Sequence, residues 1–291
     1  MTTLSHTPVV AEGARPERWF LVLHGLLGRG SNWRSFTRRV VSAHPDWGGV
    51  LVDLRMHGES QGFAPPHTVE SAAADLDRLV EQLPGPAEGV VGHSLGGKVA
   101  LAWSREARGL RRAMILDASP GPRPTGAGSE MTQEVLGLLR TLPPVLPSRR
   151  AFLEKVEGAG QPPGVAAWLA MNLEPAEGGV RLAVDLGAME SLFEDVLRRD
   201  DWALVESPPA GLHLDFILGG RSTTVDPAAR ARLEQLAAAG SVRLTVLPGA
   251  GHWVHVDDPE GTFRAVSAAL AGEDTDGPGT SAASGRSERV G

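Results

Sequence analysis

Residues 89–100 read GVVGHSLGGKVA, and the fold of the protein depends on how this stretch is interpreted. Gly92 to Lys98 fits G-x-x-x-x-G-K, the beginning of a phosphate-binding P-loop. Gly92 to Gly96 fits G-x-S-x-G, the turn that presents a nucleophilic serine. Both motifs stand between a strand and a helix, so the neighbouring elements do not separate them. The decision rests on the chemistry of single residues.

The P-loop interpretation fails at position 99. A P-loop needs a Ser or Thr hydroxyl for Mg²⁺ directly after its lysine, and this chain has Val99 there. Met114 to Asp117 does resemble the apolar strand whose final aspartate holds Mg²⁺ in such enzymes, but nothing else in the chain gathers around a nucleotide. Lys98 is therefore interpreted as a residue of the first helical turn that points to solvent or pairs locally.

The composition is that of an ordinary globular protein, with 291 residues, 42% hydrophobic and 22% charged. The net charge of −7 argues against nucleic acid or an anionic membrane surface as the main partner. The chain has no cysteine, which excludes disulfides, thiolate metal sites and cysteine nucleophiles. Residues 1–10 lack a signal-peptide pattern, and no run approaches the roughly 18 apolar residues of a membrane span. We expect a cytoplasmic protein without a membrane span, of unknown oligomeric state.

Short apolar runs alternate with helical segments along most of the chain. Residues 19–23, WFLVL, form a continuous apolar run, as expected of a strand buried on both faces. Similar runs occur at 49–53, 90–91, 113–116, 214–218 and 242–247. Helical segments lie between them, at about 31–43, 68–83, 97–107, 226–239 and 259–271. The alternation predicts an α/β fold with a mainly parallel, doubly wound sheet covered on both sides.

The alternation stops in the middle of the chain, after a proline-rich stretch at 120–124. Helix-like segments follow at about 130–142, 148–156, 163–172 and 186–198. We interpret about 121–210 as a helical cap inserted into a single domain of residues 18–271. Residues 1–17 are expected to be an N-terminal arm, either a strand or frayed. Residues 272–291 are small, polar and aperiodic, which predicts a disordered tail.

The second motif makes Ser94 the candidate nucleophile. Gly92 and Gly96 remove the clashes that would forbid a strained strand-to-helix turn. A serine hydroxyl needs a base, and His252 stands in a glycine-rich loop directly after the last predicted strand. Ser94 and His252 can meet, because the carboxyl ends of parallel strands share one edge of the sheet. His255 lies three residues further on, but no third ligand accompanies this pair, so no metal site is expected.

The carboxylate that orients the histidine has two candidates. Asp117 ends the strand at 114–117, whereas Asp226 follows the next predicted strand and adjoins Pro227, as a helix N-cap does. We assign the acid to Asp117 and keep Asp226 as the alternative. Asp53 is interpreted as structural.

Two backbone N–H groups are needed for the oxyanion of the tetrahedral intermediate. Leu95 directly follows the nucleophile and is expected to supply the first. Leu26, in the loop HGLLG at 24–28, is expected to supply the second. The polar stretch 52–60 is interpreted as a structural corner beside the site, with His57 outside the catalytic set.

Together these segments resemble the α/β-hydrolase superfamily, and closely its small acyl esterases of the YbfF type and their mitochondrial relatives in animals. The likeness runs from about residue 19 to 271. It rests on HGLLGRGSNW (24–33), VDLRMHGES (52–60), GHSLGGKVAL (92–101), ILDASP (115–120), FILGGRSTTV (216–225) and GAGHWVH (249–255). It implies an α/β-hydrolase fold and hydrolysis of carboxylic esters and some thioesters without a cofactor. It also implies Asp117 as the acid, because FILGGRSTTV carries Ser-Thr-Thr where most members have an acid.

The leading hypothesis is therefore a serine hydrolase that cleaves small or acyl esters through Ser94, Asp117 and His252 and an acyl-enzyme. An acyltransferase or lyase with the same triad, or a ligand-binding receptor with little turnover, are the alternatives. Apolar residues around the expected site are candidates for the substrate pocket: Leu27, Trp168, Met171, Met189 and Trp253. The identity of the substrate does not follow from the sequence.

Overall fold

The computed structural model describes residues 2–272 and contains a sheet of seven strands. Their order is β1 (His6–Val9), β3 (Trp47–Val52), β2 (Arg18–Leu23), β4 (Ala87–His93), β5 (Arg112–Leu116), β8 (His213–Gly219) and β9 (Arg243–Leu247). All neighbours pair in parallel except β1, which runs antiparallel to β3 at the edge. The predicted α/β class with a mainly parallel sheet is confirmed.

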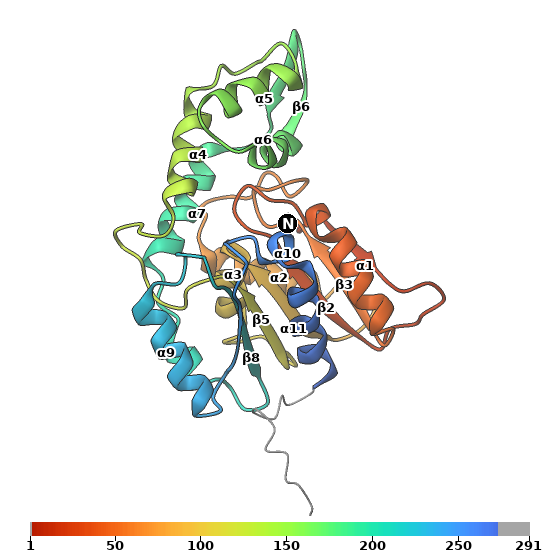
Figure 1. Ribbon diagram of the computed structural model, residues 1–291. Helices are drawn as coiled ribbons and strands as arrows, with labels where there is room; N and C mark the ends of the chain where they lie inside the picture. Colours follow the sequence, from red (N-terminus) through yellow and green to blue (C-terminus); the bar gives the residue numbers. More distant parts are fainter. Residues whose placement is uncertain (1, 273–291) are drawn as a thin grey trace, which may run out of the picture.

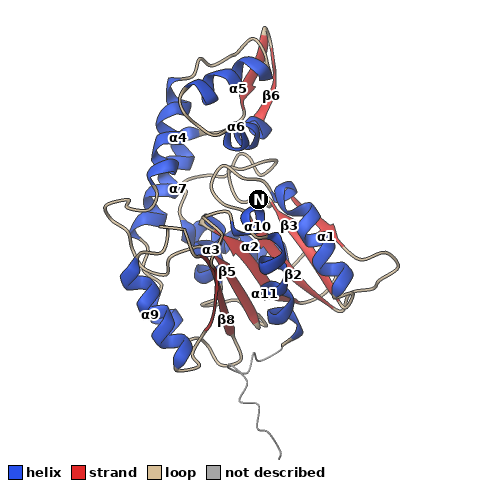
Figure 2. Cartoon of the chain, in the orientation of Figure 1, coloured by secondary structure: helices blue, strands red, loops and turns tan. Residues whose placement is uncertain are grey.

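Helices cover both faces of this sheet, because alternate strand residues point to opposite sides. Phe20 and Val22 pack with α1 (Arg34–Ala43) and α11 (Pro259–Ala271) on one face. Leu21 and Leu23 belong to the core on the other face, which includes α2 (Val69–Val80), α3 (Leu95–Trp103) and α9 (Pro227–Ala238). Figure 2 shows the strands enclosed between these helices. Two short elements, η1 (Gly30–Trp33) and α10 (Val254–Asp257), complete the body.

The structure describes residues 2–17 of the N-terminal arm but only the first residue of the expected C-terminal tail. Within the expected N-terminal arm, β1 pairs with β3, which corresponds to the strand alternative. At the other end, Gly272 closes α11 in the left-handed conformation with φ +72°. The rest of the predicted disordered tail, residues 273–291, lies outside the described residues. None of the helices between residues 2 and 272 is both long enough and apolar enough to cross a membrane.

The inserted segment lies above the carboxyl edge of the sheet (Figure 1). It contains α4 (Glu130–Thr141), α5 (Arg149–Gly158), α6 (Pro163–Leu169), η2 (Ala170–Asn172), β6 (Leu173–Ala176), β7 (Gly179–Leu182) and α7 (Leu186–Arg198). The short helix α8 (Trp202–Glu206) follows it, and Trp202 packs against Arg232 of α9 in the body. The antiparallel hairpin β6–β7 was not expected, because its residues are only partly buried and lack a clear alternation. We call residues 121–201 the cap.

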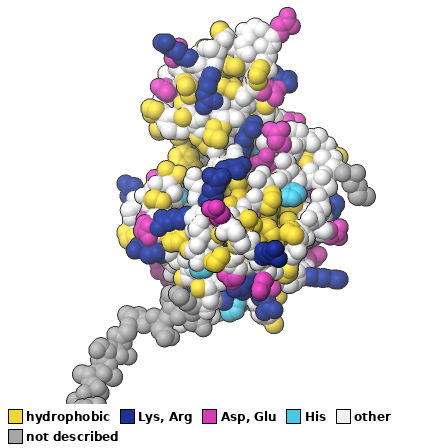
Figure 3. Space-filling view, turned by 90° about the vertical axis from the view of Figure 1, so that its right-hand side faces the viewer, with side chains coloured by type: hydrophobic (Ala, Val, Ile, Leu, Met, Phe, Trp, Pro, Cys, Tyr) yellow, Lys and Arg dark blue, Asp and Glu magenta, His cyan; other side chains and the backbone are white. Residues whose placement is uncertain are grey.

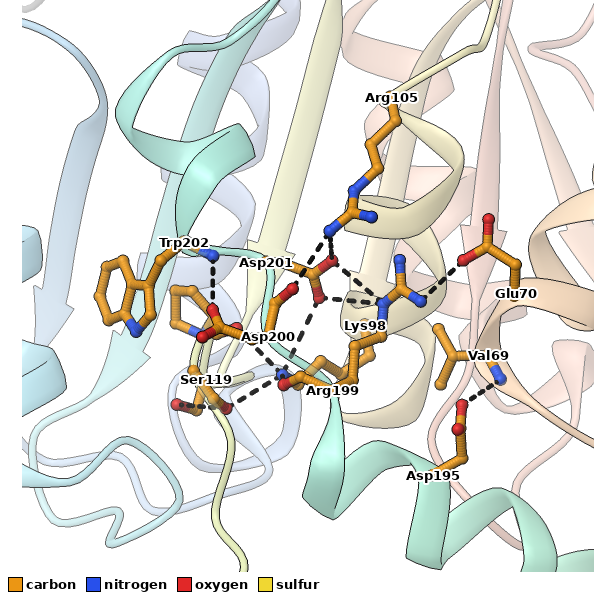
Figure 4. A network of polar contacts seen from close by, with 12 residues as sticks. Val69, Glu70, Lys98, Arg105, Ser119, Asp195, Arg199, Asp200, Asp201 and Trp202 are labelled. Carbon is orange, nitrogen blue, oxygen red and sulfur yellow. Dashed lines mark hydrogen bonds and ion pairs between the residues drawn. The ribbon is translucent and has the colours of Figure 1, made fainter.

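Lys98 binds both ends of the cap (Figure 4). Its Nζ donates to the carbonyl oxygens of Pro120 and Gly121, at 3.1 Å each, where the chain leaves the sheet. It also donates to the carbonyl of Arg199 at 2.8 Å and lies 3.9 Å from Asp201, where the chain returns. The side chain is only 1% exposed, and burial lowers the pKa of Lys98 to about 8. The expectation that Lys98 points to solvent or pairs locally is wrong, because its partners are 22 to 103 residues away.

Candidate active site

Ser94 lies in a sharp turn between β4 and α3, with φ +54° and ψ −115°. A Cβ atom at Gly92 would approach the Gly96 carbonyl oxygen to 2.2 Å, and one at Gly96 would approach the Leu23 carbonyl oxygen to 2.3 Å. Neither contact is possible for a real side chain, so the turn requires both glycines. The G-x-S-x-G pattern therefore corresponds to a backbone that exposes one hydroxyl above the sheet.

Asp117 and His252 are in direct contact. The Oδ2 atom of Asp117 lies 2.7 Å from Nδ1 of His252. The Asp117 carboxylate is fully buried and also accepts hydrogen bonds from the Gly219 amide (3.0 Å) and the Ser222 hydroxyl (2.5 Å). The Thr224 hydroxyl lies 3.0 Å from the same imidazole nitrogen. The carboxylate is thus held by three neighbours at the end of β5.

Asp226 has a different position. Its carboxylate accepts hydrogen bonds from the amides of Ala228 and Ala229, both at 2.9 Å, and caps α9. Ser222 and Thr224, which sequence reasoning did not assign to the site, precede Asp226 in the chain and contact Asp117 and His252 respectively. Their signal was visible in FILGGRSTTV, where hydroxyls occupy the usual place of an acid.

Unfavourable backbone conformations occur in and beside this site. The non-glycine residues with positive φ among residues 2–272 are Leu27 (63°), Met56 (63°), Ser94 (54°) and Asp117 (45°). Two of them carry the proposed nucleophile and acid, and the other two lie in the loops that follow β2 and β3. Such conformations are unfavourable and persist where surrounding contacts hold them, which is typical of functional sites.

The loop after β2 lies against the serine. A Cβ atom added to Gly25 would lie 3.4 Å from the Ser94 Cβ. Leu26 lines the same two cavities as Ser94. Leu95 is the first residue of α3, so its N–H has no acceptor within the helix. Leu95 thus directly follows the serine, and Leu26 borders the two cavities that the serine lines.

Two buried histidines connect this loop to the loop after β3. His24 Nε2 accepts from the Leu54 amide and His57 Nε2 accepts from the Leu27 amide, both at 3.1 Å. The Nδ1 atom of each ring faces a backbone carbonyl, that of Gly25 or Arg55, and donates to it. Each ring is neutral in this arrangement, and burial lowers the pKa of His24 to about 4 and that of His57 to about 3. His57 supports the loop backbone and lies outside the Ser-Asp-His set.

The loop that carries His252 has its own support. His93 Nε2 donates to the His252 carbonyl oxygen at 2.8 Å, and burial holds the pKa of His93 well below its ordinary value. His255 stacks on Trp33 with ring centroids 3.9 Å apart. Burial lowers the pKa of His255 to about 4. Within the described part of the chain, no group of three or more His, Asp or Glu side chains could hold a metal ion.

Because the pKa values of these buried histidines are lowered, we expect the protein to lose stability in mild acid. In the unfolded chain His24 and His255 take up protons near pH 6.5, whereas in the folded protein they stay neutral down to about pH 4. Between these values the unfolded state binds more protons, so the free energy of unfolding should fall as the pH drops from about 6.5 to about 4. Urea unfolding at a series of pH values measures it. His255→Phe should flatten this dependence, and His213→Gln, at an exposed position, should leave it unchanged; a wild-type stability independent of pH in this range would contradict the prediction.

Two cavities meet at Ser94 and His252. The larger, of about 660 Å³, is mainly apolar, and the smaller, of about 190 Å³, includes the more polar side chains of Arg123, Arg221 and Thr224. The larger cavity is lined from the cap by Val135, Val165, Trp168 and Met171 and from the body by Leu26, Leu27, Trp33, Phe36, Trp253 and Val256. Figure 3 faces this side of the molecule, where hydrophobic side chains gather in the hollow below the cap.

Four of the five predicted pocket residues line the larger cavity: Leu27, Trp168, Met171 and Trp253. Met189 does not, and that prediction was wrong. It lies on α7 and is fully buried in the hydrophobic core, while Phe193 of the same helix lines the smaller cavity. An apolar stripe on a helix does not reveal whether it packs against protein or faces a cavity.

The chain is similar in sequence to known proteins over most of its length. The sequence model described as "Alpha/beta hydrolase family" matches residues 20–265. The mouse protein "sn-1-specific diacylglycerol lipase ABHD11" is 28% identical over 255 residues, which cover 86% of this chain and 80% of the mouse protein. A 2-succinyl-6-hydroxy-2,4-cyclohexadiene-1-carboxylate synthase of Serratia proteamaculans (strain 568) is 31% identical, but over only 40% of this chain and 44% of its own.

Among solved structures, the fold is similar to that of "Marine microorganism esterase", with a TM-score of 0.78, 21% identity and coverage of 93% of this chain and 100% of that one. The expected likeness to animal relatives is confirmed by the mouse protein. With a match over most of its length, the chain belongs to the alpha/beta hydrolase family.

Proposed function

We propose that this protein is a serine esterase that hydrolyses carboxylic esters, and thioesters of similar shape, whose acyl group is apolar. The observation that carries the proposal is the contact of 2.7 Å between His252 and the buried Asp117, beside a serine held in a strained turn. The hydrolase family and the lipase and esterase among its similar proteins support the same reaction class.

Each proposed site residue has its own role in the reaction. The Asp117 carboxylate accepts the Nδ1–H of His252, which leaves Nε2 free to take the proton of the Ser94 hydroxyl. The serine oxygen attacks the acyl carbon, and the N–H groups of Leu26 and Leu95 bind the resulting oxyanion. His252 then gives the proton to the departing alcohol or thiol. Water, activated by the same histidine, releases the acyl group from Ser94.

The two cavities suggest how the substrate lies. The larger, apolar cavity accepts the acyl chain, and the smaller one, which includes Arg123 and Arg221, accepts the more polar leaving group. A buried methylene contributes about 0.8 kcal/mol, so each added carbon should raise kcat/KM about fourfold until the larger cavity is filled.

The test is a chain-length series of p-nitrophenyl esters and acyl thioesters together with labelling by a fluorophosphonate probe. We expect labelling, and a kcat/KM that rises from acetyl to chains of intermediate or greater length. Adding an alcohol as acceptor distinguishes a hydrolase, which releases free acid, from an acyltransferase, which forms a new ester. Folded protein that neither labels nor turns over any ester would contradict the proposal and favour the receptor alternative.

A further inference from the structure

The loop that carries Leu26 contains a turn in an unfavourable conformation. The Gly28 amide donates to the Gly25 carbonyl at 3.0 Å, which closes a four-residue turn with Leu26 and Leu27 at its centre. Leu27, the third residue of this turn, has φ +63°. That position ordinarily calls for Gly or Asn, because a larger side chain crowds the backbone there. Contacts from outside the turn must therefore hold Leu27.

Those contacts come from two sides. The Leu27 amide donates to His57 of the body at 3.1 Å, and the Leu27 carbonyl accepts from Nδ2 of Asn172 in the cap at 2.9 Å. Leu27 and Asn172 are each only 3% exposed. Water has little access to these groups, so each hydrogen bond is costly to lose. The cap thus forms a hydrogen bond with the turn through a side-chain amide that is 145 residues away in the sequence.

The orientation of this amide is determined by its neighbours. The Oδ1 atom of Asn172 accepts from Nε of Arg29 at 3.2 Å, and a guanidinium can only donate. The Nδ2 group must therefore face the Leu27 carbonyl, which can only accept. The Asn172 backbone carbonyl accepts from the Ala183 amide at 2.8 Å, which ties this residue to the cap segment after the hairpin β6–β7. The site requires one donor and one acceptor at a fixed spacing, as an asparagine provides.

We propose that Asn172 is a positioning residue for the oxyanion-binding loop. By holding the strained Leu27 from the cap side, it keeps the neighbouring Leu26 N–H beside Ser94. Oxyanion binding is then complete only while the cap is seated, and the cap contributes to the chemical step as well as to the pocket. This inference rests on the proposed esterase function. In Figure 1, the cap elements on either side of Asn172, α6 and β6, lie above the carboxyl edge of the sheet.

The experiment replaces the donor with an acceptor of the same shape. Asn172→Asp retains the contact with Arg29 but places a carboxylate oxygen against the Leu27 carbonyl. The matched control is Glu174→Gln, the converse exchange two residues away, which removes only an ion pair with Arg181 on the hairpin. Steady-state kinetics with a p-nitrophenyl ester are measured for each, together with the affinity for an alkyl trifluoromethyl ketone, whose adduct with serine carries an oxyanion.

We expect Asn172→Asp to lower kcat about 10- to 100-fold with KM within about threefold of wild type, because an oxyanion donor is worth about 10²–10³ in rate and is displaced here, not removed. The affinity for the trifluoromethyl ketone should fall by a similar factor. Asn172→Ala should lie between this variant and wild type, and Glu174→Gln should match wild type in all three measurements. A merely structural role of Asn172 would lower the melting temperature without this separation of kcat from KM.

A kcat within about twofold of wild type, or a loss confined to KM, would overturn the proposal. Should Asn172→Asp not fold, as judged by circular dichroism, Asn172→Ala is held to the same criterion. Wild-type protein without ester turnover or fluorophosphonate labelling would instead refute the esterase function, so the two failures are distinguishable.

Discussion

Ser94→Ala is expected to lower kcat for ester hydrolysis by about 10⁴- to 10⁶-fold, because the acyl-enzyme can no longer form. The residual rate would come from the oxyanion donors and from substrate binding. Alanine keeps the Cβ atom at this strained position, so the fold should be retained. Hydrolysis of a p-nitrophenyl ester and labelling by a fluorophosphonate measure the effect.

Ser104→Ala is the control for this substitution. Ser104 directly follows α3, its hydroxyl donates to the Ala100 carbonyl at 2.7 Å, and it is buried away from the described cavities. We expect a small loss of stability and unchanged labelling. If Ser94→Ala labels like wild type while Ser104→Ala does not, the nucleophile is wrongly assigned.

Asp117→Asn should lower kcat by about 10⁴-fold, the second largest effect. The Gly219 amide and the Ser222 hydroxyl donate to the two oxygens of this carboxylate. An amide there would present N–H toward His252 Nδ1 and favour the imidazole tautomer whose Nε2 is already protonated. Ser94 would then face no base. The measurement is the pH profile of kcat/KM in wild type and variant.

Asp226→Asn is the matched control, since the same exchange falls on the alternative acid. Asn is as good a helix N-cap as Asp, so the capping of α9 should survive and kcat should stay within about twofold of wild type. If Asp226→Asn proves inactive and Asp117→Asn active, the assignment of the acid is reversed.

The contrast between these two aspartates shows which part of the candidate site can be predicted from the sequence. Asp117 ends an apolar strand and Asp226 precedes a proline. Both facts are local and can be seen in the sequence. In the structure Asp117 contacts His252, and Asp226 caps the start of α9. The proximity itself, across 135 residues, depends on the pairing of β5 with β8 and of β8 with β9, the strand that His252 follows.

The interpretation of Lys98 and Met189 failed for one shared reason. Burial of a side chain depends on what packs over it, and both residues are covered by distant segments. Lys98 is enclosed by the two ends of the cap. Met189 is enclosed by other members of the hydrophobic core cluster to which it belongs. Periodicity along the chain indicates which residues share a face and not what that face meets.

By itself the sequence determined the alternation of strands and helices, the glycine-lined serine turn and the order of the Ser, Asp and His segments. These follow from backbone sterics and short-range periodicity, which act within a few residues. Only the tertiary structure decided which loops meet: Asn172 of the cap at the Leu27 carbonyl, and Lys98 at both ends of the cap. Such contacts join residues 22 to 145 positions apart, and the chain places them together only when the sheet, its helices and the cap pack as one body.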